Sequence, residues 1–224
     1  MKPWVRLDTA TVPGGGGELR LMQRDSEFSI MAGAITLMNS RMSGSETALA
    51  ELACDRLRDR PNCRVLIGGY GMGFTLRAVL AGLGAKAQVV VAELVPAVLE
   101  WARGPMAAWT AGCLDDPRVH LIAGDVAAVI GATIGSYDAI LLDVDNGPDG
   151  VTRDANNQLY SMRGLALAKV ALKPGGILAV WSARPDASFA RRLKDVGFKV
   201  EEICVRARGN GKGPRHVIWF CRLR

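Results

Sequence analysis

Short apolar runs alternate with amphipathic stretches over most of this chain. Five of the runs have the length and apolar character of buried strands: 64–68, 88–93, 118–122, 137–143 and 177–182. Each precedes a segment that reads as a helix: 73–83, 95–109, 126–131, 157–171 and 186–195. Such repeated strand–helix units predict a mostly parallel, doubly wound α/β sheet. Two further runs, 198–206 and 215–222, have no helix between them and predict an antiparallel C-terminal hairpin, which makes seven strands.

The first 44 residues differ from the rest in their pattern of apolar and polar side chains. They hold a flexible tetraglycine, Gly14 to Gly17, and then three stretches that partly alternate apolar and polar side chains: 18–22, 27–31 and 34–38. This alternation predicts a small antiparallel N-terminal sheet. We therefore expect two parts: a β element over residues 1–44 and a nucleoside-binding, Rossmann-like catalytic domain over residues 45–224.

The second part is expected to begin with a helix. Ser43-Gly44-Ser45-Glu46 fits a capping box, in which the Ser43 hydroxyl and the Glu46 carboxylate each accept a backbone amide at the helix start. The apolar positions that follow have helical spacing to about residue 60.

Composition narrows the class of protein. The 224 residues are 49% hydrophobic and 22% charged, as in an ordinary globular domain. No apolar run approaches the ~20 residues that span a bilayer, and the N-terminus lacks the apolar core of a signal peptide, so a cytoplasmic location is expected. Five cysteines without a CxxC pair and only two histidines predict no metal site.

Four strand ends carry the candidate chemistry. The strand at 64–68 runs into a glycine-rich turn that contains Gly68, Gly69, Gly71 and Gly73. The next three strands end at Glu93, Asp125 and Asp143. In an open α/β sheet ligands bind outside the carboxyl ends of the strands, so these groups are expected to surround one crevice. Glycine there lets the backbone approach a ligand closely.

Each carboxylate suits a different part of a nucleoside. Glu93 can accept hydrogen bonds from both hydroxyls of a ribose, and Asp125 can accept one from an exocyclic adenine amine. Asp125 also fits a simple helix N-cap. Asp143 lies where the reacting end of a ligand is expected, and it can take a proton from an amine, alone or with Asp145. Asp145 fits a turn residue better than a catalytic one.

The acidity of this crevice argues against phosphate ligands. The turn lacks the Lys-Ser/Thr of a P-loop, and three acidic strand ends would repel a pyrophosphate. A cationic or neutral nucleoside fits better. S-adenosylmethionine, a sulfonium nucleoside, meets that charge requirement.

Several of these motifs resemble a known family. They are the turn from Val65 to Gly73, Glu93-Leu94-Val95-Pro96, Gly124-Asp125-Val126 and Tyr137-Asp138-Ala139-Ile140-Leu141-Leu142-Asp143. They are similar to the class I S-adenosylmethionine-dependent methyltransferase fold, and within it to the spermidine synthases, which are aminopropyltransferases. The resemblance implies transfer of an aminopropyl group from decarboxylated S-adenosylmethionine to a small-molecule amine acceptor. It implies the following nucleoside-binding residues: Gly68, Gly69, Gly71, Gly73, Glu93, Leu94, Asp125 and Val126. Asp143 and Asp145 would be catalytic.

Two positions depart from the family pattern. Where these synthases carry an acid that holds the amine of the decarboxylated nucleoside, this chain has Gly71. Their D-x-x-D-P motif reads Asp143-Val144-Asp145-Asn146-Gly147-Pro148. A methyltransferase that uses S-adenosylmethionine on a small molecule is therefore the alternative.

Further hypotheses concern nucleic-acid binding, a binding protein without catalysis, and oligomeric state. The net charge of +6 and a basic loop with Arg206, Arg208, Lys212 and Arg215 would suit a nucleic-acid methyltransferase, although a solvated basic face explains them more simply. A binding protein that keeps the nucleoside pocket without catalysis is a further alternative. The edges of the N-terminal strands suggest a possible homodimer.

Overall fold

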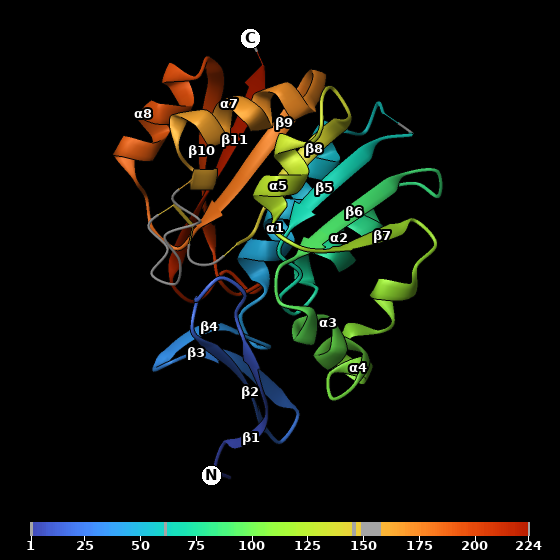
Figure 1. Ribbon diagram of the computed structural model, residues 1–224, viewed down its shortest axis with the longest axis vertical. Coiled ribbons are helices and arrows are strands. Elements are labelled where there is room, and N and C mark those ends of the chain that lie inside the picture. Colours follow the sequence, from blue (N-terminus) through green and yellow to red (C-terminus); the bar gives the residue numbers. More distant parts are fainter. Residues whose placement is uncertain (1, 61, 145–146, 149–157, 224) are drawn as a thin grey trace.

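A computed structural model describes residues 2–60, 62–144, 147–148 and 158–223 of the chain. It contains two sheets, one above the other in the view of Figure 1. The smaller sheet is antiparallel, with its strands in the order in which they occur along the chain: β1 (Val5–Thr11), β2 (Glu18–Arg24), β3 (Glu27–Ala32) and β4 (Ile35–Asn39). The predicted N-terminal sheet is confirmed. The sequence did not reveal β1, because nearly all of its side chains are exposed and carry no burial pattern.

The larger sheet has seven strands in the order β10-β11-β9-β8-β5-β6-β7. Their bounds are β5 (Arg64–Gly68), β6 (Gln88–Glu93), β7 (Val119–Ala123), β8 (Tyr137–Leu142), β9 (Leu172–Ser182), β10 (Phe198–Arg206) and β11 (Arg215–Leu223). Strands β5 to β9 pair in parallel, whereas β11 is antiparallel to both β9 and β10. This confirms the predicted doubly wound α/β fold and its C-terminal hairpin. The hairpin is not wholly at the edge, because β11 is inserted between β9 and β10.

Helices cover both faces of this sheet (Figure 1). They are α1 (Gly44–Arg56), α2 (Phe74–Gly82), α3 (Pro96–Arg103), α4 (Ala107–Thr110), α5 (Val126–Gly131), α7 (Met162–Ala171) and α8 (Ala187–Asp195), with a 3₁₀ turn η1 (Cys113–Asp115). The predicted helix 95–109 is two helices, because Gly104 and Pro105 interrupt it. Proline lacks the amide proton that a helix interior needs. Helix α7 starts after Ser161, whose hydroxyl accepts the amide of Gly164 at 3.1 Å.

The expected capping box at the start of α1 is wrong. Ser43 is the N-cap residue, but its side chain makes no capping hydrogen bond. Glu46 is buried, and its carboxylate accepts a hydrogen bond from the Ser45 hydroxyl at 2.7 Å. The sequence pattern was right about where the helix starts and wrong about what these side chains do.

The central strands bury both of their faces. Along β5, Val65 and Ile67 pack into one hydrophobic cluster and Leu66 into the other, as the two-residue period of a strand requires. The first cluster also takes in Leu21 and Ile30 from the N-terminal sheet. Both sheets thus share one apolar layer, and the division of the chain at residue 44 stays a prediction.

The buried carboxylate of Asp138 forms ion pairs with Arg60 and Lys173. It lies near the amino end of β8. Asp138 accepts hydrogen bonds from Arg60 at 2.8 Å, from Lys173 at 2.6 Å and from the Arg64 amide at 2.8 Å. Burial by itself would raise the pKa of Asp138, but these donors together hold it below its ordinary value.

We expect Asp138→Ala to lower the free energy of unfolding by about 2 kcal/mol, because it leaves the buried Arg64 amide without an acceptor while Arg60 and Lys173 regain water. Since the folded-state pKa is lowered, the contribution of Asp138 is present at neutral pH and is lost as the pH falls through that pKa. Urea unfolding at neutral pH and near pH 3 measures both effects. An Asp138→Ala deficit that stays the same at both pH values would contradict the assignment. Asp55→Ala is the control, because its ion pair with Arg58 is exposed.

Candidate active site

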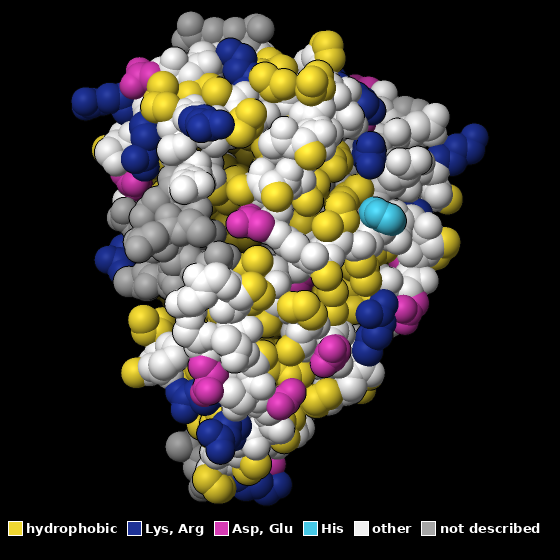
Figure 2. All heavy atoms as spheres, viewed as in Figure 1, with side chains coloured by type: hydrophobic (Ala, Val, Ile, Leu, Met, Phe, Trp, Pro, Cys, Tyr) yellow, Lys and Arg dark blue, Asp and Glu magenta, His cyan; other side chains and the backbone are white. Residues whose placement is uncertain are grey.

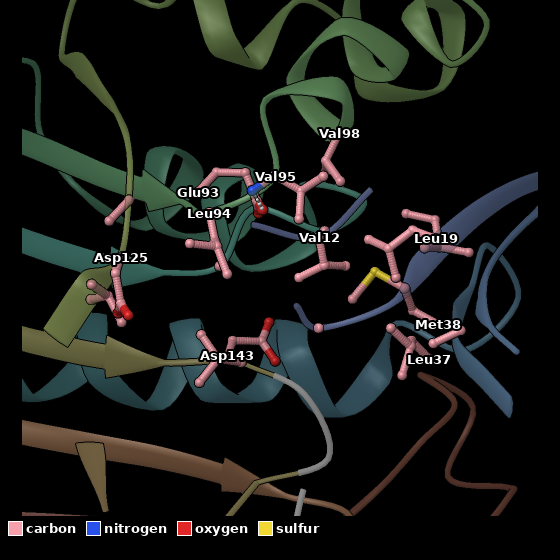
Figure 3. Close-up of a pocket in the computed structure, with 18 of the residues that line it drawn as sticks. Val12, Leu19, Leu37, Met38, Glu93, Leu94, Val95, Val98, Asp125 and Asp143 are labelled. Carbon is pink, nitrogen blue, oxygen red and sulfur yellow. Dashed lines mark hydrogen bonds between the residues drawn. The ribbon is translucent and has the colours of Figure 1, made fainter. Parts of the chain in front are cut away.

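A pocket lies between the carboxyl ends of the central parallel strands and the N-terminal sheet (Figure 3). One side is built by the loops that follow β5, β6, β7 and β8, which contribute Gly69, Gly71, Glu93, Asp125 and Asp143. The other side comes from the N-terminal part of the chain and is apolar. It consists of Val12, Gly16, Leu19, Ile30, Ala32, Leu37 and Met38. Leu94, Val95, Val98, Gly124, Val126 and Val144 complete the lining, together with Ala92.

The glycine-rich turn after β5 has a shape that other residues do not adopt easily. Gly69 has a φ of +85°, and a Cβ atom there would lie 2.5 Å from the carbonyl oxygen of Asp143. Its amide donates to Ala92 O at 2.9 Å, which ties the turn to β6. The backbone of two neighbouring strand ends can therefore come together only with glycine at this position.

The other predicted glycines differ in where they lie. Gly71 lines the pocket together with Gly69. Gly68 is not among the residues that line the pocket, and a Cβ atom there would come within 2.9 Å of the Val126 side chain. Gly73 is the N-cap residue of α2 and lies against the Tyr70 ring. Gly68 and Gly73 therefore shape the turn without lining the pocket.

Met38 of β4 occupies the space beside Gly71. A Cβ atom on Gly71 would lie 2.5 Å from both the sulfur and the terminal methyl of Met38. Figure 3 shows the Met38 side chain reaching into the gap from the N-terminal sheet, opposite the strand ends. An apolar thioether thus lies where an acidic side chain at position 71 would begin.

Glu93 ends β6 and is almost fully buried, with 7% of its surface exposed. One carboxylate oxygen accepts the Tyr70 amide at 2.8 Å and the other accepts the Val95 amide at 2.8 Å. Burial raises the pKa of Glu93, and these backbone hydrogen bonds oppose that rise. The carboxylate therefore holds the glycine turn in place, and each oxygen retains a lone pair for a ligand hydroxyl.

Asp125 caps a helix, as one of its two sequence interpretations predicted, and its place in the pocket leaves the adenine-binding interpretation a prediction. It is the N-cap residue of α5, with Oδ1 accepting the Ala127 amide at 2.8 Å, and it also lines the pocket. Leu94 and Val126 also line the pocket with apolar side chains. Apolar side chains and a carboxylate are groups that can contact the face and the amine of a base.

Asp143 follows β8 directly and is half-buried at the pocket wall. Its Oδ2 accepts the hydroxyl of Thr75, from α2, at 2.7 Å, and its amide donates to Gly68 O at 3.0 Å. Burial raises the pKa of Asp143 to about 6, against the opposing hydrogen bond from Thr75. A carboxyl with this pKa is mostly ionised at neutral pH and can still accept a proton during a reaction. Asp145, the other predicted catalytic acid, lies outside the described residues.

Acidic groups supply all the formal charge of this pocket. Its lining contains three carboxylates and no Lys or Arg among the described residues. No group of three or more potential metal ligands occurs in the part of the chain that the structure describes. The arrangement suits a ligand that is neutral or cationic rather than a phosphate.

A protein-family model described as the spermine/spermidine synthase domain matches residues 52–190, which is more than half of the chain. The chain belongs to the spermine/spermidine synthase family. The matched segment runs from α1 to α8 and so contains all the acidic strand ends of the pocket.

Curated members of this family align with part of the chain. Polyamine aminopropyltransferase 2 of Pseudomonas aeruginosa is 35% identical over 162 residues, which cover 67% of this chain and 43% of that protein. Polyamine aminopropyltransferase of Mycobacterium tuberculosis is 37% identical over 124 residues, covering 54% of this chain and 23% of that protein. The chain thus spans less than half the length of these relatives.

Solved structures agree on the fold. Spermidine synthase from Thermotoga maritima superposes with a TM-score of 0.76 at 19% identity, covering 97% of this chain and 72% of that one. A spermidine synthase in complex with the transition state analogue AdoDATO gives 0.75 at 20% identity, with the same coverage. Human methyltransferase-like protein 13, in complex with SAH, gives 0.58 at 22% identity and covers 81% of each chain.

The sequence did not identify the apolar half of the pocket or the residues behind Asp143. The sequence signals for ligand contacts lie at the strand ends, whereas Met38 and its neighbours in the N-terminal sheet show only the pattern of strand residues. Thr75 carried no signal beyond a polar position at a helix start. Glu46 had a signal, a carboxylate at the start of an apolar helix, but it was assigned to capping.

Proposed function

We propose that this chain transfers an aminopropyl group from decarboxylated S-adenosylmethionine to a small-molecule amine. The observation that carries the proposal is the convergence of Glu93, Asp125 and Asp143 on one pocket beside a glycine turn. Membership of the spermine/spermidine synthase family and the polyamine aminopropyltransferase names of the relatives support it.

The proposed reaction is a displacement at a carbon bonded to sulfonium sulfur. The amine nitrogen forms a bond to that carbon while the carbon–sulfur bond breaks, and the electron pair leaves with a neutral thioether. An amine must lose one proton to attack, and Asp143 accepts it. Because the leaving group is already good, the protein contributes mainly by orienting nitrogen, carbon and sulfur.

We assign the binding roles from the position of each group in the pocket. Glu93 accepts the ribose hydroxyls with the lone pairs that the backbone amides leave, and Asp125 accepts the adenine amine. Leu94 and Val126 contact the base, and Gly69 and Gly71 let the ligand approach the backbone. Asp145 remains a proposed helper of Asp143.

The direct test is an assay of donor consumption with the full chain. The protein is incubated with decarboxylated S-adenosylmethionine and a panel of mono-, di- and triamines, and release of the thioether nucleoside is followed by chromatography. Acceptor-dependent release supports the proposal. A complete lack of release, with donor binding verified by calorimetry, leaves the binding-protein alternative.

Methyl transfer from S-adenosylmethionine is the second candidate, and the pairing of Gly71 with Met38 favours it. No acidic side chain at position 71 is available to hold the amine of the decarboxylated donor, and Met38 fills that space. The same assay with S-adenosylmethionine, with formation of S-adenosylhomocysteine as the readout, separates the two reactions.

Gly71→Asp is expected to raise the affinity for the decarboxylated donor about tenfold relative to S-adenosylmethionine, because a charge-assisted hydrogen bond to its amine becomes possible. Aspartate tolerates the φ of +55° better than most residues, and the contact atoms of Met38 are the flexible end of its side chain. Calorimetry with both nucleosides measures the ratio, and Gly71→Asn is the control of equal shape without charge. An equal gain for Asn and Asp would show that charge recognition is not the cause.

Two further partners stay predictions. The N-terminal sheet leaves Val5 and Ile35 exposed on its edge strands, at 55% and 42%, which supports a homodimer that analytical ultracentrifugation can test. Figure 2 shows Lys and Arg side chains scattered around the margin of one face rather than gathered in a patch on it. A solvated basic face is the simpler explanation of the basic loop, so we expect no salt-sensitive retention of RNA. Among the described residues, no helix is both long and apolar enough to cross a membrane.

A further inference from the structure

The first turn of α1 is pressed against the end of the C-terminal hairpin. The Gly44 amide donates to Ala207 O at 2.8 Å, and a Cβ atom on Gly44 would lie 2.4 Å from the Arg208 carbonyl carbon. Only glycine allows this approach. As a result the next two residues, Ser45 and Glu46, are buried facing β11, with 0% and 8% of their surfaces exposed.

Ser45 joins two titratable groups from opposite ends of the chain. Its hydroxyl oxygen lies 2.7 Å from Glu46 Oε2 and 2.8 Å from His216 Nδ1. The His216 ring is held by an edge-on contact with Trp181, at 4.8 Å between centroids. A hydroxyl donates one hydrogen bond and accepts others, so the chain of bonds has two arrangements. Either a protonated Glu46 donates to Ser45 and Ser45 donates to His216, or His216 donates to Ser45 and Ser45 donates to an ionised Glu46.

The same glutamate lies next to the proposed base. Thr75 Oγ1 is 2.7 Å from Asp143 Oδ2 and 3.4 Å from the Glu46 carbonyl oxygen. In the described part of the chain, Glu46 is linked to two titratable groups: to Asp143 after β8 through its charge, and to His216 of β11 through the Ser45 hydroxyl. The Thr75 hydroxyl of α2 lies near the Glu46 carbonyl oxygen. The backbone of the loop after β10 lies against Gly44 at the start of α1. No cation is among these neighbours.

We propose that Glu46 is a positioning residue that carries the shared proton of this carboxyl pair, held by Ser45 and His216, so that Asp143 stays ionised and ready to take a proton from the amine. The role of Asp143 in this statement rests on the proposed function, whereas the Glu46–Ser45–His216 chain rests on geometry alone. Two acids within reach of each other's charge divide their roles in this way when one is stabilised as a carboxylate and the other as a carboxylic acid.

The surroundings of the two acids agree with this division. Burial, and next the charge of Asp143, raise the pKa of Glu46 to about 7, above the value of about 6 for Asp143. Burial lowers the pKa of His216, so its ring is neutral near pH 7 and can accept the Ser45 proton at Nδ1. The pair titrates as a unit, with the first proton leaving mainly from Asp143.

The ring nitrogens of His216 report the state of Glu46 without any substrate. The chain has only two histidines, and His120 on β7 provides an internal reference for ¹⁵N NMR. As the pH rises from 6.5 to 8.5 we expect the imidazole proton of His216 to move from Nε2 to Nδ1, with a midpoint near 7, as Glu46 loses its proton. His120 should show no such exchange.

Variants distinguish a proton-holding role of the Glu46–Ser45–His216 chain from a purely structural role. Glu46→Gln and Ser45→Ala should each leave His216 in one tautomer that does not change over this pH range, and circular dichroism identifies a variant that fails to fold. Glu51→Gln, on the exposed side of the same helix, should keep the wild-type change. With an active substrate pair, Glu46→Gln should leave the acid limb of the kcat profile near its wild-type position, because the neutral amide replaces a carboxylic acid that is also neutral while Asp143 titrates.

A wild-type His216 whose tautomer does not respond to pH would overturn the inference and leave the proposed function intact. The inference is also overturned if Glu46→Gln moves the acid limb down by about one pH unit, because that would mean that Glu46 is ionised while Asp143 titrates. A protein that shows the tautomer change but consumes neither donor would instead reject the proposed function.

Discussion

Asp143→Asn is expected to lower kcat about 10²- to 10⁴-fold, which is the usual contribution of a positioned general base. Asparagine keeps the size of the side chain and its carbonyl can still accept the Thr75 hydroxyl, so the pocket should keep its shape. It has no carboxylate to take the proton of the amine. Donor affinity measured by calorimetry should change by less than about threefold, because the role proposed for Asp143 is at the reacting end rather than at the nucleoside.

The pH dependence of the proposed reaction in the wild-type protein provides a second test of the same residue. The base must be ionised to act, and burial raises its pKa to about 6. The rate should therefore be at its plateau above pH 7 and fall about tenfold for each pH unit well below 6. Asp143→Asn should lose this acid limb along with most of its rate. A full-rate variant, or one that keeps the acid limb unchanged, would show that another group is the base.

Gly69→Ala is expected to lower the free energy of unfolding by about 3 kcal/mol and to abolish nucleoside binding. The left-handed backbone of Gly69 costs an alanine about 1–2 kcal/mol. In addition the new methyl group would lie 2.5 Å from the carbonyl oxygen of Asp143, and that backbone oxygen has no freedom to rotate away. The strain would separate the β5 turn from the β8 end, and so would displace Asp143.

Urea unfolding of variants at two other glycines distinguishes the cost of the left-handed backbone from the cost of the close approach to the Asp143 carbonyl oxygen. Gly112 has a φ of +67° with no atom within 4 Å of an added Cβ, so Gly112→Ala should cost only the backbone term, about 1 kcal/mol. Gly84 has open space and an ordinary φ, and Gly84→Ala should have no measurable cost. Calorimetry with S-adenosylmethionine and its decarboxylated form tests binding. Equal losses for Gly69→Ala and Gly112→Ala would mean that the close approach at Asp143 has no energetic effect.

The acidic strand ends could be placed from the sequence because of a general property of parallel sheets. Once the apolar runs identify β5, β6, β7 and β8 as strands of one parallel sheet, their carboxyl ends must lie at one edge. Glu93, Asp125 and Asp143 follow from that without knowledge of any side-chain contact. The same reasoning failed for β1, whose exposed side chains leave no periodic signal.

Local patterns were less informative where two elements meet. Ser43 to Glu46 has the spacing of a capping box, yet the contact of Gly44 with the hairpin turns Ser45 and Glu46 inward. A local rule describes a helix end in water, whereas this end is buried against another element. The same limitation hid the apolar wall of the pocket, because the pattern of β4 does not tell which surface Met38 faces.

The sequence by itself determined the strand–helix order, the glycine turn and the acids at the strand ends, because these depend on period and on the direction of parallel strands. Only the tertiary structure decided what lies opposite them and behind them. Met38 is 33 residues from Gly71 along the chain, and Ser45 is 171 residues from His216. Contacts over such separations depend on how the N-terminal sheet and the C-terminal hairpin pack on the central sheet, and no local pattern encodes that packing.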